Sequence, residues 1–138
     1  MNWTKFLIAT LIGGIAYFFS GWLVYGLLLN DLMAAPPDLA QVVTYPEEEF
    51  KIGYMALSCL VWGALLAFIF MRWANISTFM GGLKGGAILA ALISLSVGLG
   101  LASQYKVWSI QTTLADVIGG AITTGLAGGL IGWYLGRK

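Results

Sequence analysis

The sequence contains no histidine, a single cysteine (Cys59) and three prolines among 138 residues. Without histidine the chain cannot supply a His-ligated haem or a Ser-His-Asp triad, and one cysteine excludes a disulfide framework and a zinc finger within the chain. Charge is also scarce, because 7 basic and 6 acidic side chains make up only 9% of the residues. Soluble domains carry roughly 25% charged residues. The composition therefore predicts a membrane protein.

Apolar residues are correspondingly abundant. They make up 59% of the chain, and the mean hydropathy is +0.87. A helix needs roughly 20 apolar residues to cross a bilayer. Four runs are long enough, at about residues 6–29, 52–71, 82–103 and 114–136. Because the bilayer core has no water to satisfy backbone groups, each run is predicted to be helical. The first run is too long for the apolar part of a signal peptide, so we expect a retained anchor.

We therefore predict an all-α fold, a single membrane domain over residues 1–138 that forms an up-down-up-down bundle of four helices with an outer loop at 30–51. The orientation follows from charge. Basic residues occupy the two ends of the chain and the second loop: Lys5, Arg72, Lys84, Arg137 and Lys138. All six acids lie in or beside the first and third loops: Asp31, Asp38, Glu47, Glu48, Glu49 and Asp116. The positive-inside rule then places both termini in the cytoplasm, with the chain a multi-pass protein of the inner (cytoplasmic) membrane.

Glycine is abundant, with 19 residues, nearly all of them within the apolar runs. Small residues recur every four positions in the third run: Gly82, Gly86, Ala90, Ser94, Gly98 and Ala102. The fourth run contains a similar series: Gly120, Thr124, Gly128 and Gly132. Such a series forms a shallow ridge on a helix, which lets a second helix approach closely. The ridges predict packing of the third helix on the fourth, or in part on another protomer or a larger complex.

Two ionisable residues near the spans are candidates for a polar site, Lys84 and Asp116. Lys84 lies near the start of its helix and can extend to the lipid headgroups. Asp116 follows Thr113 by three positions, which matches a capping box at the start of the fourth helix. Alternatively, Asp116 handles a proton or a cation at the outer mouth. The two cannot pair, since antiparallel helices would place them roughly 30 Å apart, on opposite sides of the membrane.

The remaining candidates are aromatic or lie in the outer loop. Trp22 and Trp62 lie deep in their spans, where they are packing residues or flank an apolar ligand. The segment from Pro36 to Val43 predicts a short surface helix. Pro46 and the three glutamates that follow it predict the start of the second helix, where carboxylates complement the helix dipole. Nothing in the pattern indicates a catalytic residue, a metal site, a cofactor or a nucleic-acid partner.

The layout resembles small bacterial four-helix membrane proteins that are grouped as families of unknown function. The similar features are the opening Met1-Asn2-Trp3, the pairs Gly21-Trp22 and Tyr25-Gly26, a proline-bearing outer loop, and a last span that reads Asp116-Val117-Ile118-Gly119-Gly120 and then Gly132-Trp133. The resemblance implies four spans and no particular activity.

The leading functional hypothesis is a non-enzymatic integral membrane protein that acts through helix packing, among membrane lipids, as a homo-oligomer or an accessory subunit of a membrane complex. One alternative is a small channel or transporter that forms on oligomerisation. Another is a binder of a lipid-like or quinone-like apolar ligand, held between helices and flanked by Trp22 and Trp62.

Overall fold

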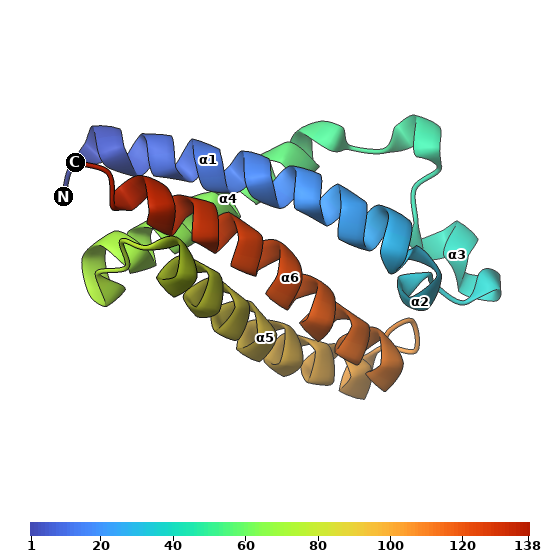
Figure 1. Cartoon of the computed structure of the whole chain (residues 1–138). Coiled ribbons are helices and arrows are strands. Elements are labelled where there is room, and N and C mark those ends of the chain that lie inside the picture. The colour runs from blue at the N-terminus through green and yellow to red at the C-terminus, as the bar shows by residue number, and fades with distance from the viewer.

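The computed structural model describes all 138 residues, and every regular element in it is helical. The bundle has four long segments: α1 (Trp3–Gly21) continued by the π-helical η1 (Trp22–Leu28), α4 (Ile52–Ile69) continued by the π-helical η3 (Phe70–Ala74), α5 (Phe79–Gln104), and α6 (Ile110–Leu135). Each is long and apolar enough to cross a membrane. The predicted all-α fold and its four long apolar helices are confirmed. The two termini lie together at one end (Figure 1).

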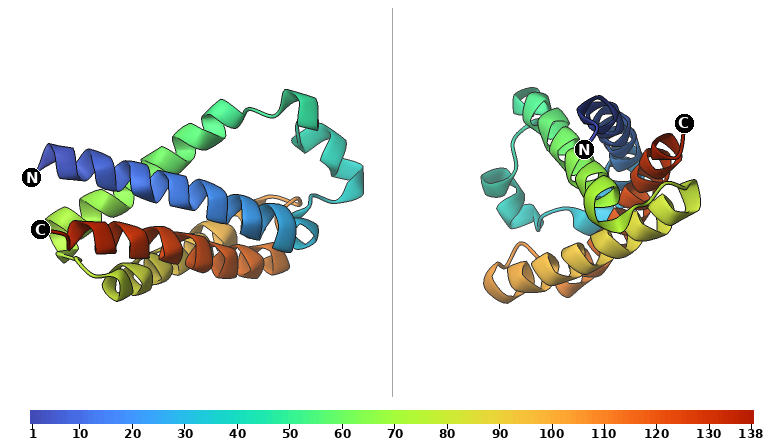
Figure 2. Two further views of the ribbon diagram at one scale, coloured as in Figure 1. Left: turned by 45° about the horizontal axis from the view of Figure 1, so that its top comes forward. Right: turned by 90° about the vertical axis from the view of Figure 1, so that its left-hand side faces the viewer.

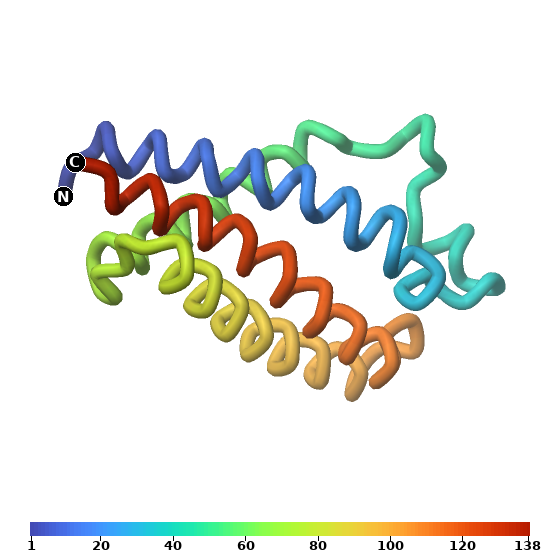
Figure 3. The backbone as a smooth tube through the Cα atoms, viewed as in Figure 1, coloured from blue at the N-terminus to red at the C-terminus, as the bar shows by residue number.

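The segment between η1 and α4 contains three short helical elements, α2 (Asn30–Met33), α3 (Pro37–Val43) and the 3₁₀ turn η2 (Glu47–Glu49). They lie at the opposite end of the bundle from the termini, and the chain then arches back to α4 (Figure 3). The short helix predicted after Pro36 is confirmed, with Pro37 in its first turn.

The prediction that the three glutamates start the second long helix is wrong. They form the isolated turn η2, after which Phe50 adopts an extended backbone and α4 begins only at Ile52. Lys51 precedes α4 without a capping hydrogen bond from its side chain. The glutamates are exposed, so their charges belong to the connecting segment and not to the end of α4.

Helices α5 and α6 pack so closely that glycine is required at their contact. A Cβ atom added at Gly82 would overlap the carbonyl oxygen of Gly128, and one added at Gly86 would overlap that of Thr124. Likewise, a Cβ at Gly132 would overlap the carbonyl oxygen of Thr78, just before α5. The two ridges of small residues therefore face each other within the chain.

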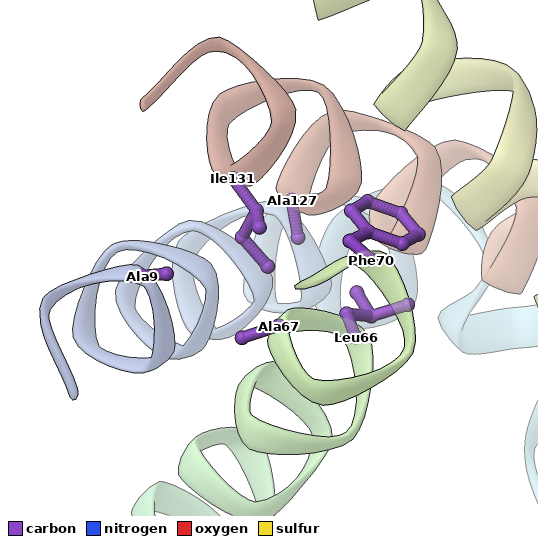
Figure 4. Close-up of a cluster of buried hydrophobic side chains, with 6 residues drawn as sticks. All are labelled: Ala9, Leu66, Ala67, Phe70, Ala127 and Ile131. Atoms are coloured by element: carbon purple, nitrogen blue, oxygen red, sulfur yellow. The ribbon is translucent and has the colours of Figure 1, made fainter. Parts of the chain in front are cut away.

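Helix α6 is the centre of the bundle, because it packs on α1 as well as on α5 (Figures 1 and 2). In its most apolar window 56% of residues are buried, against 17% in α5. A cluster of buried side chains joins α6 to α1, α4 and η3 (Figure 4): Ala9, Leu66, Ala67, Phe70, Ala127 and Ile131. The side chain of Ile131 occupies the space that a Cβ at Gly13 would need. This core lies toward the end that carries the termini.

Helices α1 and α4 meet at one close crossing and then separate. At the crossing, a Cβ at Gly63 would lie 2.6 Å from both the carbonyl oxygen of Thr10 and the amide nitrogen of Gly14. Toward its amino end α4 diverges from α1 (Figure 2), and residues 51–58 are all exposed. The divergence leaves a wedge between the two helices at the end of the bundle away from the termini.

We predict that Gly86→Leu destabilises the fold by about 3 kcal/mol or more, because the new side chain meets backbone of α6 that cannot move aside. The control is Gly100→Leu, since no atom lies within 4 Å of a Cβ at Gly100. Its effect should stay within about 0.5 kcal/mol. The free energy of unfolding is measured by titration from a mild detergent into SDS. Equal stability of the two variants would contradict the close α5–α6 contact.

Candidate functional site

The wedge between α1 and α4 contains a cavity of about 490 Å³ that also reaches Asp116, near the amino end of α6. Small-molecule sites typically measure about 300–1,000 Å³, so the volume suits a ligand. Five of the lining residues are aromatic: Tyr17, Phe18, Trp22, Tyr25 and Phe50. The walls are therefore mainly apolar, and aromatic surface from η1 faces the amino-terminal half of α4.

Asp116 is the only charged residue that lines the cavity. Its carboxylate oxygen Oδ1 accepts a hydrogen bond of 2.9 Å from the hydroxyl of Tyr25, and the same hydroxyl lies 3.3 Å from the carbonyl oxygen of Asp116. The side chain is half-buried. A carboxylate held in this way presents an oriented acceptor to a predominantly apolar space.

The capping-box interpretation of Asp116 is wrong, because α6 begins earlier than its apolar pattern indicates. Ser109 is the N-cap, and its hydroxyl accepts a hydrogen bond from the amide of Thr112. Thr113 is buried against Gly98 of α5, and its hydroxyl accepts a hydrogen bond from the Trp108 indole. Asp116 thus lies in the second turn of α6, which frees its carboxylate to face the cavity.

Tyr25 reaches Asp116 because α6 has no side chains beneath its ring. A Cβ at Gly119 would lie 3.0 Å from the ring atom Cζ of Tyr25, and one at Gly120 would lie 3.5 Å from its hydroxyl. Tyr25 itself belongs to η1, whose wider π-helical turn is a feature found often at functional sites. Two consecutive glycines and a local change of helix geometry therefore position the pair.

The side of the cavity formed by α4 is open to the surroundings of the bundle. Met55 and Ser58 are exposed, whereas Cys59 is buried behind them. Across the cavity Trp22 is 63% exposed although it lies deep in its span. No atom lies within 4 Å of a Cβ built at Gly21, so this wall also has free space. An apolar molecule can enter sideways, between α1 and α4.

The two tryptophans considered together in the sequence have different positions. Trp22 lines the cavity. Trp62 lies deeper, where its indole nitrogen donates a 3.0 Å hydrogen bond to the hydroxyl of Thr124 and its ring lies 6.0 Å from that of Tyr17. Trp62 therefore joins α4 to α6 and does not line the cavity. Sequence reasoning missed Tyr25 as a site residue, whose only signal was a hydroxyl in the carboxyl-terminal third of its span.

Lys84 is exposed on α5, away from the cavity. The contacts of Gly82 with Gly128 and of Gly86 with Thr124 place Lys84 level with about residue 126 of α6. Ten residues separate that level from Asp116, which is about 15 Å along the helix axis. This separation is shorter than the membrane thickness expected from the sequence, because α6 extends beyond the start of the predicted span. The two residues do not pair.

No group of three or more Cys, Asp or Glu side chains is placed to hold a metal ion, and the three glutamates of η2 are exposed.

Comparison with known proteins found no matching family model, no similar curated protein and no similar solved structure. The resemblance to small bacterial four-helix membrane proteins stays a prediction.

We predict that Tyr25→Phe lowers the free energy of unfolding by about 1–2 kcal/mol, because the Asp116 carboxylate loses its hydrogen-bond donor inside the bundle. The matched control is Tyr54→Phe, since Tyr54 is 75% exposed and lies outside the cavity. The SDS titration measures both variants. If Tyr25→Phe were as neutral as Tyr54→Phe, the hydrogen bond would not contribute to stability.

Proposed function

We propose that the chain is an integral membrane protein that binds an amphipathic small molecule in the cavity between α1, α4 and α6. One observation carries the proposal. Aromatic side chains line a space of about 490 Å³, and one oriented carboxylate faces it. Aromatic surface stabilises an apolar body, and the carboxylate orients a polar group. The apolar body enters from the lipid phase.

The proposed role is non-enzymatic. The cavity offers one carboxylate, which Tyr25 already binds, and no lysine or arginine that would complete an acid–base pair. Ser58 and Cys59 line the same space, but neither hydroxyl nor thiol has a basic partner there to activate it as a nucleophile. Binding therefore accounts for the lining residues better than catalysis does.

The ridges of small residues do not offer a surface for assembly, because they are in contact with each other within the chain. The contact between α5 and α6 already buries the glycines of both ridges: Gly82, Gly86, Gly128 and Gly132. A homo-oligomer or a larger complex would therefore have to form through the outer faces of the bundle, where large apolar residues such as Ile88 and Leu92 are exposed. Assembly stays a prediction, and the mass of the protein–detergent complex measures it.

The proposed orientation in a bacterial inner membrane has both termini in the cytoplasm, with the helices running up-down-up-down. Support comes from the end of the bundle that carries the termini. There the ammonium of Lys5 donates a 2.9 Å hydrogen bond to the carbonyl oxygen of Arg137, whose guanidinium lies 3.7 Å from the ring centre of Trp133. Basic residues with an interfacial tryptophan are typical of a cytoplasmic interface.

The orientation has a direct test. A green fluorescent protein fused after Lys138 should fluoresce, because it folds in the cytoplasm, and alkaline phosphatase fused at the same point should be inactive. The reciprocal result, with active phosphatase and no fluorescence, would reverse the orientation and place the cavity on the cytoplasmic side.

Ligand binding is tested with 1-pyrenemethanol, an apolar fluorophore that accepts energy from tryptophan. We predict saturable energy transfer in the purified protein, and its loss in Gly21→Phe, because the phenyl ring extends into free space of the cavity. The control is Gly100→Phe, at a helix position that is equally open but outside the cavity. Its binding should match that of the original protein. If Gly21→Phe binds the probe unchanged, the cavity is not the site.

A further inference from the structure

We infer that the ligand of this cavity is a lipophilic cation, an ammonium-type group on an apolar body, with the positive charge at Asp116. The inference rests on the proposed function and names the chemical class of its ligand. Three features of the chain support it, namely the charge of the lining, the aromatic surface around the carboxylate, and the charge of the segment beside the entrance.

The first feature is a carboxylate without a cationic partner. The hydrogen bond from Tyr25 is the only one that the Asp116 side chain accepts, and it engages Oδ1 alone. No lysine or arginine is among the lining residues. An anion in an apolar environment is costly unless it is paired with a positive charge. A cationic ligand would provide that charge, whereas an anionic ligand would add repulsion.

The second feature is the aromatic surface. Tyr17 and Trp22 line the cavity together with Asp116, and Phe50 reaches the cavity from the connecting segment. The face of an aromatic ring attracts a cation through its quadrupole, and several rings around one space are the usual recognition element for quaternary ammonium groups. The same rings offer apolar surface to the body of the ligand. Charge and apolar surface thus favour the same class of molecule.

The third feature is the charge of the segment 30–51. It contains five carboxylates and one lysine, a net charge of −4: Asp31, Asp38, Glu47, Glu48, Glu49 and Lys51. Phe50, near the end of this segment, and Ile52, the first residue of α4, both line the cavity. A negative field beside an entrance raises the local concentration of cations and repels anions. The segment therefore selects the same charge as Asp116.

The experiment compares three probes that share the pyrene ring system and differ in the charge of a short side group. At neutral pH 1-pyrenemethylamine is a cation, 1-pyrenemethanol is neutral and 1-pyreneacetate is an anion. The protein is reconstituted in nanodiscs of zwitterionic phosphatidylcholine, and empty nanodiscs give the background. We expect the ammonium probe to bind about tenfold more tightly than the alcohol, because the attraction of one opposite charge at short range exceeds the cost of desolvating the ammonium by about that factor. The acetate should bind most weakly.

Variants then assign the preference to one carboxylate. Asp116→Asn should bind the ammonium probe about as weakly as the alcohol. Asp116→Glu keeps the negative charge and should retain most of the preference for the ammonium probe over the alcohol. The matched control is Gln104→Lys, which changes the net charge by the same +1 at an exposed position of α5 outside the cavity and outside segment 30–51, and it should change the preference less than twofold. The comparison of the three probes on the original protein needs no variant, so it stands even if Asp116→Asn fails to fold.

Each outcome has one meaning. Equal affinity for the ammonium and the alcohol, with both lost in Gly21→Phe, would overturn the cation inference and leave the proposed function in place. A charge preference that Asp116→Asn leaves unchanged would overturn the assignment to Asp116. No saturable binding of any of the three probes would overturn the proposed function and the inference together. Tighter binding of the ammonium that is lost in Asp116→Asn and kept in Gln104→Lys supports both.

Discussion

The contact between α5 and α6 is the interaction on which the rest of the bundle depends. In a bilayer the hydrophobic effect does not drive helices together, so they associate through dispersion contacts and hydrogen bonds, which require close approach. Gly82 and Gly86 on α5 meet carbonyl groups of α6 with no side chain between them. This register fixes α6 along its length. Its other face then receives α1, and with it the aromatic residues of η1.

The second helix pair is built differently, and the cavity follows from that difference. Helices α1 and α4 come close where Gly63 meets Thr10 and Gly14, and α4 has no series of small residues to continue the contact. Toward its amino end α4 diverges from α1 (Figure 2), and residues 51–58 are exposed. The core around Leu66 and Phe70 secures the other end. Because α4 is packed into the core only at its carboxyl end, a cavity remains between its amino end and α1, and this cavity is the candidate site.

Asp116 faces the cavity because of its position along α6. Because Ser109 takes the capping position, the carboxylate lies in the second turn of α6 and not at its beginning. Gly119 and Gly120 let Tyr25 lie against α6 and bind that carboxylate. The glycines that permit close packing and the carboxylate that faces the cavity thus belong to one helix, which couples the stability of the bundle to the geometry of the site.

The sequence by itself determined the all-helical class, the four long apolar segments and the short helix after Pro36, because hydropathy and proline act locally along the chain. It also indicated ridges on α5 and α6, since a four-residue period is visible without a partner. Only the tertiary structure decided what the ridges contact, where α6 begins, and that Tyr25 binds Asp116 across 91 positions of sequence. The same limit applied to Trp22 and Trp62, which have similar sequence contexts and separate roles. Each of these depends on how two helices are registered, and registry is set by side chains of both helices, which no single segment of sequence contains.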